Sequence, residues 1–185
     1  MEYYKLDIKG YEHALPILPI GGGIKICFFN LHGAQALTEH CGKELAKEVQ
    51  GAEVVITAES KGLQLAHVVA RELGQEFYAV ARKSKKLYMQ DGISVTVKSI
   101  TTAETQTLYL SRHDADLIKG KKVAIVDDVI STGDSLRAME ELVIDAGAEI
   151  AGKMAILAEG EAAERKDIIY LQKLPLFNPD GSIKG

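Results

Sequence analysis

Short apolar runs alternate with amphipathic helical segments along most of this chain. Val54–Ile56 and Val123–Val126 are consecutive apolar residues, a pattern typical of strands that are buried on both faces. Residues 34–49, 63–73 and 136–144 instead place their apolar side chains on one stripe of a helix. Strands that alternate with helices in this way predict an α/β fold, with a mostly parallel central sheet flanked by helices.

The remaining segments complete the expected sheet and add a ribbon. Phe77–Ala81 and Lys153–Ala158 predict further strands, and Ile168–Leu171 predicts a last edge strand. Residues 93–97 and 108–110 alternate apolar with polar side chains, which favours a two-stranded ribbon with one wet face. All four prolines lie near the ends of the chain and no linker separates the elements. We therefore expect one domain over residues 1–185, with an N-terminal appendage of irregular structure.

Composition narrows the class of protein and of partner. Apolar residues make up 46% and charged residues 26% of the 185 positions, as in ordinary globular proteins. A net charge of −4 gives no general attraction to nucleic acid. The start of the chain lacks the pattern of a secretory signal, and no apolar run is long enough to span a bilayer. The only cysteines, Cys27 and Cys41, are not spaced as a metal or redox pair. We expect a cytoplasmic protein that binds neither nucleic acid nor membranes.

The segment from Val123 to Ser135 carries the strongest chemical signal. Asp127 and Asp128 are expected where a buried strand ends, and two carboxylates there can accept hydrogen bonds from a vicinal diol. The small and hydroxylated residues that follow lead directly into a helix, whose first backbone N–H groups form a cradle for a phosphate. These cradle residues are Ser131, Thr132, Gly133, Asp134 and Ser135. A diol site beside a phosphate site describes a ribose 5-phosphate.

Three other interpretations explain this segment less well. Helix capping explains one polar residue but not the ordered set. A nucleotide-hydrolysing fold requires a G-x-x-x-x-G-K-[ST] loop, which the sequence lacks. A phosphoacceptor receiver domain would carry its acidic pair near the start of the chain. The ribose 5-phosphate interpretation is therefore preferred.

Two further segments have the composition of a binding site for a polyanion such as pyrophosphate. After the strand that ends near Thr57, Ser60 and Gly62 let backbone amides approach an anion and Lys61 adds charge. Taken alone, this segment is more often a surface turn with a serine cap. The densest cationic run of the chain, residues 82–86, follows the next strand, at the sheet edge where ligands bind. Such runs are equally often solvated loops.

The ordered set of motifs resembles the type I phosphoribosyltransferases. Residues 123–135 resemble the phosphoribosyl pyrophosphate (PRPP) signature, Thr57–Leu63 the pyrophosphate loop of the adenine-specific group, and Ala81–Leu87 its basic segment. The resemblance extends over nearly the whole chain and is closest to adenine phosphoribosyltransferase. It implies a base-pocket region over residues 1–32 and a mobile hood over residues 91–114 that closes over the sugar and excludes water.

The resemblance also implies a role for each candidate residue. Asp127 and Asp128 hold the ribose diol, directly or through Mg²⁺ and water, and residues 131–135 bind the 5-phosphate. Asp134 replaces the usual glycine of that loop and is expected to cap the helix and point away from the phosphate. The pyrophosphate contacts are assigned to Ser60, Lys61, Gly62, Arg82, Lys83 and Lys86.

The base side of the implied site is less sharply defined. Glu104 is the only carboxylate between Gly92 and His113. It is therefore a candidate for hydrogen bonding to a purine ring nitrogen. A solvated acid in a loop is at least as compatible with the sequence. The candidates for packing on the base are Ile24, Ile26 and Phe28, which could equally be ordinary core residues.

The implied reaction transfers 5-phosphoribosyl from PRPP to a purine base, with Mg²⁺ as cofactor, and releases pyrophosphate. Adenine is the base that the resemblance favours, and a transferase for xanthine, guanine or hypoxanthine is the alternative within the family. A non-catalytic sensor of PRPP or purines with the same fold is the alternative outside enzymes. The resemblance further implies a homodimer.

Overall fold

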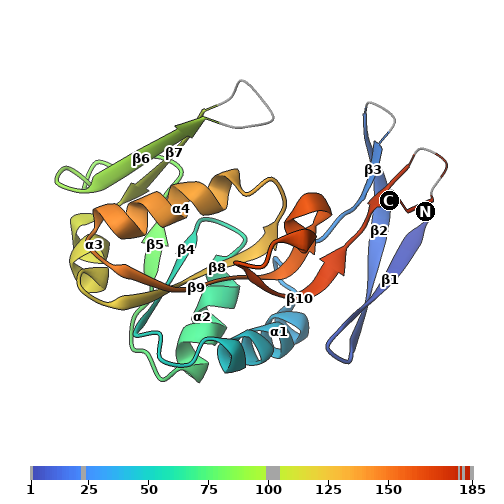
Figure 1. Ribbon diagram of the computed structural model, residues 1–185, viewed down its shortest axis with the longest axis horizontal. Helices are drawn as coiled ribbons and strands as arrows, with labels where there is room; N and C mark the ends of the chain where they lie inside the picture. Colours follow the sequence, from blue (N-terminus) through green and yellow to red (C-terminus); the bar gives the residue numbers. More distant parts are fainter. Residues whose placement is uncertain (1, 22–23, 99–104, 179, 181, 184–185) are drawn as a thin grey trace.

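The computed structural model describes residues 2–21, 24–98, 105–178, 180 and 182–183. Its centre is a parallel sheet with the strand order β10-β9-β8-β4-β5, as the sequence predicts (Figure 1). Its edge strand β10 is the one expected near Ile168–Leu171. The strands are β4 (Val54–Ala58), β5 (Ala79–Ala81), β8 (Lys122–Ile130), β9 (Glu149–Glu159) and β10 (Ile169–Leu174).

Helices cover both faces of the central sheet, which is why its strands are apolar throughout. Side chains of α1 and α2 pack with Val55 and Val126 on one face. Side chains of α3 and α4 pack with Ile56 and Ile125 on the other. The helices are α1 (Gln35–Glu48), α2 (Leu63–Glu72), α3 (Arg112–Ile118) and α4 (Asp134–Asp145), with a 3-10 turn η1 (Gly160–Glu164) after β9. Within the described ranges no helix is both long and apolar enough to cross a bilayer.

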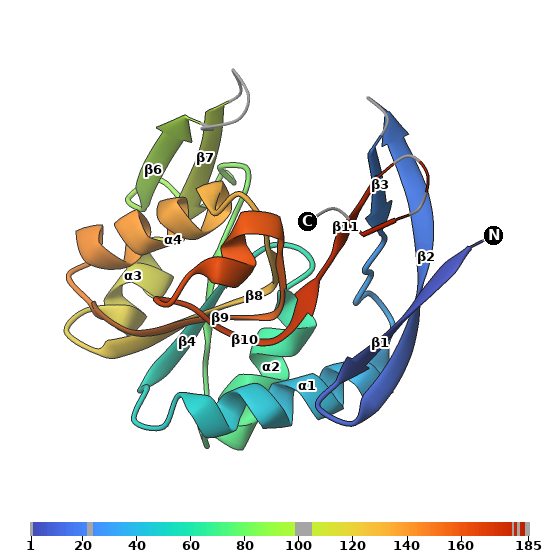
Figure 2. The same cartoon turned by 45° about the vertical axis from the view of Figure 1, so that its right-hand side comes forward.

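The N-terminal region forms a second sheet, so the expectation of irregular structure there is wrong. This N-terminal sheet has the order β1-β2-β3-β11 and stands beside the central sheet (Figure 2). Its strands are β1 (Tyr3–Ile8), β2 (Tyr11–Gly21), β3 (Ile24–Cys27) and β11 (Leu176–Phe177). Pro16 and Pro19 argue against a strand because they cannot donate a hydrogen bond. Pro16 nevertheless accepts one from Phe28 N through its carbonyl, at 2.9 Å.

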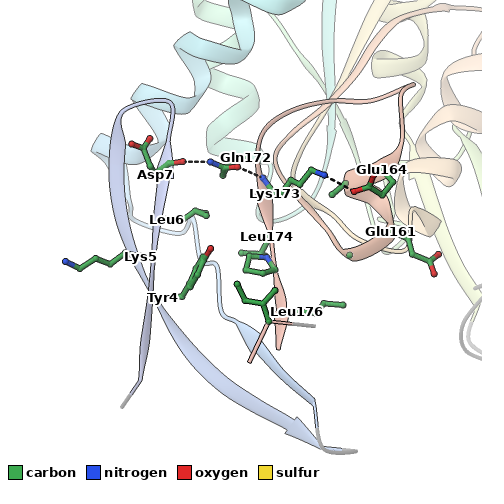
Figure 3. Close-up of a pocket in the computed structure, with 14 residues that line it drawn as sticks. Tyr4, Lys5, Leu6, Asp7, Glu161, Glu164, Gln172, Lys173, Leu174 and Leu176 are labelled. Atoms are coloured by element: carbon green, nitrogen blue, oxygen red, sulfur yellow. Dashed lines mark hydrogen bonds and ion pairs between the residues drawn. The ribbon is translucent and has the colours of Figure 1, made fainter. Parts of the chain in front are cut away.

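A cavity of about 640 Å³ lies where the N-terminal sheet meets the end of the central sheet. Figure 3 shows β1 on one side of it and the segment from β10 to β11 on the other. Gln172 Nε2 donates to Asp7 O at 2.8 Å across this junction, and the Tyr4 and Phe177 rings meet edge to face with centroids 5.5 Å apart. The two sheets are therefore joined by polar and aromatic contacts as well as by the chain itself.

The predicted ribbon is a hairpin of β6 (Ile93–Lys98) and β7 (Thr105–Leu110). Val95, Val97 and Leu108 point into the core on the α4 side of the sheet, while Ser94, Thr96 and Lys98 are exposed. This hairpin, called the hood hairpin below, therefore has one solvent-exposed face, as its alternation of apolar and polar side chains predicts. Helix α3 begins at Arg112, inside the range 91–114 that was assigned to the hood.

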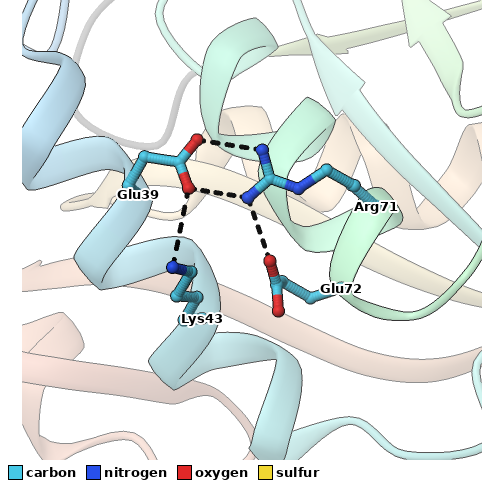
Figure 4. Close-up of polar contacts among 4 residues, drawn as sticks. All are labelled: Glu39, Lys43, Arg71 and Glu72. Carbon is cyan, nitrogen blue, oxygen red and sulfur yellow. Dashed lines mark hydrogen bonds and ion pairs between the residues drawn. The ribbon is translucent and has the colours of Figure 1, made fainter.

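Helices α1 and α2 are also linked on their outer surface by an ion-pair network (Figure 4). Arg71 donates to both carboxylate oxygens of Glu39, at 3.0 and 2.6 Å, and contacts Glu72 at 2.9 Å. Surface ion pairs contribute little, although a bidentate arginine is among the better ones. We expect Arg71→Ala to lower the Tm by about 1–3 °C in thermal unfolding at low salt.

Salt is the internal control for this prediction, because it screens exposed charges. In about 1 M NaCl the difference between Arg71→Ala and wild type is expected to shrink. Lys43→Ala, which removes a 4.0 Å contact to the same Glu39, is expected to change the Tm less. A difference that is unaffected by salt would show that the arginine acts by packing alone.

Candidate active site

The candidate residues converge at the carboxyl edge of the central sheet. The turn after β4 (residues 59–62, the pyrophosphate loop) meets β8 at Asp127, and the basic segment (residues 82–86) follows β5. Residues 131–135 (the phosphate loop) connect β8 to α4. This is the edge at which parallel α/β sheets bind ligands.

Asp127 and Asp128 lie inside β8 and not beyond its end, which corrects the sequence-based boundary. The strand continues to Ile130 because Val129 and Ile130 pair with Leu157 and Ala158 of the long strand β9. Asp128 is only 6% exposed, and its backbone N donates to Asp127 Oδ1 at 2.8 Å. The two carboxylates are thus held by regular strand pairing.

One buried oxygen of this pair accepts no hydrogen bond from the described residues. Asp128 Oδ2 is buried and makes no hydrogen bond within the described part of the chain. Lys61 Nζ forms a loose ion pair with this oxygen, 4.0 Å away. A buried carboxylate oxygen that lacks a donor costs free energy, so a hydroxyl or cation from a ligand would satisfy it. Mg²⁺ is commonly held by one or two carboxylates together with substrate oxygens, and this pair fits that pattern.

Burial and the neighbouring charge of Asp128 raise the pKa of Asp127 to about 7. The positive charge of Lys83 acts in the opposite direction, as does the hydrogen bond from Asp128 N. In the substrate-free protein, part of the Asp127 population therefore carries a proton near neutral pH. Binding of a ligand that needs both carboxylates ionised should release that proton and weaken as the pH falls below about 7.

The same pKa shift predicts a pH-dependent stability. The folded chain holds the Asp127 proton more tightly than the unfolded chain does, so its stability falls as pH rises from about 4 to about 7. Asp127→Asn removes this penalty. We expect it to raise the free energy of unfolding by about 1–2 kcal/mol at pH 8 and little at pH 4, measured by urea denaturation. An equal change at both pH values would contradict the assignment, and the exposed Asp116→Asn is the control.

The pyrophosphate loop packs closely on Thr57 of β4 only because residue 62 is glycine. A Cβ at Gly62 would lie 2.2 Å from Thr57 Oγ1 and 3.5 Å from Asp127 Oδ1. Gly62 has ordinary helical backbone angles, so space and not conformation requires glycine. The Glu59–Ser60 peptide bond is cis. Lys61 and Gly62 lie beside the acidic pair, and Ser60 precedes them in the same loop.

Glu59 is a site residue that sequence reasoning missed. Its carboxylate contacts Arg82 Nε at 2.8 Å and accepts a hydrogen bond from Lys83 N at 2.9 Å. Arg82 also exchanges backbone hydrogen bonds with Tyr109 of the hood hairpin. Glu59 therefore fixes the basic segment to the pyrophosphate loop. No local pattern signals a contact between residues so far apart in sequence.

The cationic side chains of the basic segment differ in their surroundings. Arg82 is paired with Glu59 and about one-third exposed. Lys83 is exposed, and its charge acts on Asp127. Lys86 Nζ donates to Ser84 Oγ at 2.9 Å. Lys83 is thus a cation of this segment whose charge favours the ionised form of Asp127.

The phosphate loop begins α4, but Asp134 does not hold the cap position. Gly133 is the N-cap, in the left-handed conformation at φ 82°, and Asp134 is the first helical residue. Asp134 is buried, accepts from Thr132 Oγ1 at 3.2 Å and lies 3.7 Å from Arg137 Nη2. A glycine is needed at the cap because its backbone conformation is left-handed. The Asp134 carboxylate still lies in the first turn, where the helix dipole favours it.

The hood hairpin meets the phosphate loop. Ser135 Oγ donates to Gln106 Oε1 of β7 at 3.0 Å, and Arg137 Nη2 donates to Lys98 O of β6 at 2.5 Å. Ser131 and Thr132 are exposed. Glu104 lies outside the described residues.

The N-terminal sheet supplies one candidate base-contacting side chain near the acidic pair. Phe28 follows β3 and is 41% exposed, and Lys61 Nζ lies 6.0 Å from its ring centroid. Lys61 is in turn the neighbour of Asp128. Ile26 is half-buried on β3, where it pairs with Leu18 of β2 and Leu176 of β11. Ile24 is the first residue of β3, and its side chain is outside the described set.

Comparison with known proteins identifies this arrangement. A model described as a phosphoribosyl transferase domain matches residues 30–176. The chain belongs to the phosphoribosyltransferase family. A xanthine phosphoribosyltransferase of Exiguobacterium is 31% identical over 145 residues, which are 77% of this chain and 74% of that protein. One of Bacillus cereus is 37% identical over 128 residues, 68% of this chain and 64% of its own length.

Solved structures of phosphoribosyltransferases share the fold. The adenine phosphoribosyltransferase of Thermoanaerobacter pseudethanolicus has a TM-score of 0.69 at 24% identity, covering 86% of this chain and 95% of that one. The adenine phosphoribosyltransferase of Rhodothermus marinus has a TM-score of 0.63 at 23% identity, covering 93% and 94%. The family resemblance and the α/β fold predicted from the sequence are both confirmed.

Proposed function

We propose that this phosphoribosyltransferase transfers the 5-phosphoribosyl group of PRPP to a purine base, giving a nucleoside monophosphate and pyrophosphate. The observation that carries the proposal is the meeting of Asp127 and Asp128 with the pyrophosphate loop, where a buried Asp128 oxygen accepts no hydrogen bond from the described residues. A ribose diol supplies two hydroxyl donors of the kind that such a pair accepts.

The chain's own groups then have distinct tasks. Asp127 and Asp128 orient the ribose ring through its diol, and backbone amides of residues 131–135 at the start of α4 hold the 5-phosphate. Ser60, Lys61 and Gly62, with Lys83, Lys86 and Arg82, receive the pyrophosphate. Because Arg82 is already paired with Glu59, its contribution to binding depends on that carboxylate turning aside or sharing the guanidinium.

Mg²⁺ is part of this proposal because the donor set suits it. The residues that would hold it are Asp127 and Asp128, together with oxygens of PRPP. Among the described residues no group of three or more His, Cys, Asp or Glu could hold a metal without the substrate. When bound, Mg²⁺ would spread the negative charge of the departing pyrophosphate. The protein itself positions the reactants and excludes water from an electron-poor ribosyl carbon.

Two purine bases are candidates for the acceptor, and each is supported by a different comparison. The relatives that are 31–37% identical carry the name xanthine phosphoribosyltransferase, whereas the structural likeness to adenine enzymes lies below 25% identity. We therefore propose xanthine as the first base to test and adenine, which the sequence resemblance favours, as the second. Phe28 is the described candidate for stacking on either one, with Glu104, Ile24 and Ile26 as further candidates.

We also propose a cytoplasmic homodimer that acts in purine salvage. Both cysteines are free and buried, which suits a reducing compartment. The homodimer is proposed from the family resemblance alone and is tested by light scattering on the purified protein.

The deciding experiment supplies the purified chain with Mg²⁺, PRPP and each of adenine, guanine, hypoxanthine and xanthine, and follows pyrophosphate release. We expect turnover with one base well above the others. Absence of turnover with all four, with PRPP binding retained in calorimetry, would support a non-catalytic sensor. Absence of both turnover and PRPP binding would reject the proposed function.

A further inference from the structure

Arg165, far from the PRPP signature in sequence, lies against the phosphate loop. It follows η1 and precedes β10. A Cβ built on Gly133 would lie 2.8 Å from Arg165 Nη1, so the guanidinium directly faces the loop backbone at this residue. The loop itself contains no lysine or arginine over residues 131–135.

A cavity of about 510 Å³ opens between Arg165 and the phosphate loop. Its lining includes Ser131, Thr132, Glu159, Glu161, Arg165 and Leu176. Among the described residues that line it, Arg165 is the single cation, and two carboxylates oppose it. A phosphate that enters this space needs positive charge close to it, because Asp134 and the two glutamates make the surroundings negative.

The Arg165 side chain is held in place while one nitrogen stays available. Nε and Nη2 donate to the two oxygens of Asp167 at 2.9 and 2.7 Å. Asp167 also pairs with Lys153 of β9, which contacts Glu140 of α4 at 2.7 Å. Nη1 makes no hydrogen bond to any acceptor in the described part of the chain. Because Asp167 holds the Nε and Nη2 side of the guanidinium, the N–H groups of Nη1 point in a fixed direction. The side chain therefore loses little conformational entropy when Nη1 binds an anion.

We propose that Arg165 is a phosphate-binding residue that donates from Nη1 to the 5-phosphate of the sugar, with Asp167 as its positioning residue. This inference rests on the proposed function, since it assigns the phosphate loop to that same group. The bidentate pair with Asp167 sets the direction of the guanidinium, and the series Asp167–Lys153–Glu140 anchors it to β9 and α4.

The test compares ribose 5-phosphate with inorganic pyrophosphate in titration calorimetry on the full chain. We expect Arg165→Gln to raise the Kd for ribose 5-phosphate about tenfold and to change the Kd for pyrophosphate less than about twofold. Arg165→Lys keeps the charge but loses the fork, and we expect it to recover part of the affinity. Lys173→Gln, which removes an exposed lysine paired with Glu164, is the charge-matched control.

The outcomes separate this inference from the proposed function. If wild type binds ribose 5-phosphate and Arg165→Gln binds it equally well, Arg165 makes no phosphate contact. If Arg165→Gln weakens both ligands to the same extent, the effect is general and the inference is also wrong. If wild type binds neither ribose 5-phosphate nor PRPP, the proposed function itself fails. Circular dichroism melting of each variant excludes loss of folding as the cause.

Discussion

The Asp127→Asn, Asp128→Asn double variant is expected to lose at least about 1000-fold in kcat/KM for phosphoribosyl transfer. Both residues lie in regular strand pairing of β8, so the change leaves the backbone in place. Asparagine keeps an acceptor oxygen but removes the negative charge that, in the proposed mechanism, orders the ribose diol and Mg²⁺. Initial-rate kinetics with varied PRPP measure this loss.

A matched control removes two carboxylates elsewhere. Asp116 and Asp145 are exposed, on α3 and at the end of α4 farthest from the phosphate loop. The Asp116→Asn, Asp145→Asn double variant is expected to keep most of the wild-type rate. Retained transfer in the Asp127, Asp128 variant, with folding confirmed by circular dichroism, would remove these two residues from the proposed mechanism.

Gly62→Ala is the second change for which we expect a large loss, about 100-fold in kcat/KM. The added methyl would lie 2.2 Å from Thr57 Oγ1, and Thr57 is fully buried, so it is the pyrophosphate loop that must move. That displacement shifts Ser60 and Lys61 away from Asp128. A misplacement of about 1 Å in a positioned site commonly costs about two orders of magnitude in rate.

A compensating variant makes this prediction specific. Thr57→Ala removes the oxygen that the new methyl would strike and leaves its other neighbours, Val126 O and Asp127 Oδ1, at 3.4 and 3.5 Å. The Thr57→Ala, Gly62→Ala double variant is therefore expected to regain about tenfold over Gly62→Ala alone. If the double variant is as slow as the single one, crowding against Thr57 is not the reason for the glycine.

The central sheet could be predicted from the sequence because its signals are local. Val123–Val126 must be a buried strand on any arrangement of its neighbours, and the helix that follows shows its own stripe. The order of acidic pair, phosphate loop and helix is contained within residues 123–135. A strand followed directly by a helix then places these residues at the carboxyl edge.

The features that could not be predicted depend on contacts distant in sequence. From the sequence alone, Glu59 resembles an ordinary solvent-exposed acid in a loop. Its contact with Arg82 arises only because β4 and β5 pair in the folded chain. Strand β2 contains two prolines, and its strand character depends on the partners β1 and β3. Arg165 meets Gly133 only after β9 and η1 return the chain to the phosphate loop. Contacts between residues far apart in sequence produce no periodic pattern of side chains, so hydrophobic periodicity cannot reveal them.

Strand β11 also bears on how the protein is made. Leu176 and Phe177 pair with Ile26 and Lys25 of β3, so the sheet that carries Phe28 receives its last strand from the far end of the polypeptide. During translation the first three strands leave the ribosome long before that partner exists. The part of this sheet beside Phe28 can therefore reach its final form only after Phe177 has emerged, later in translation than the acidic pair and the phosphate loop.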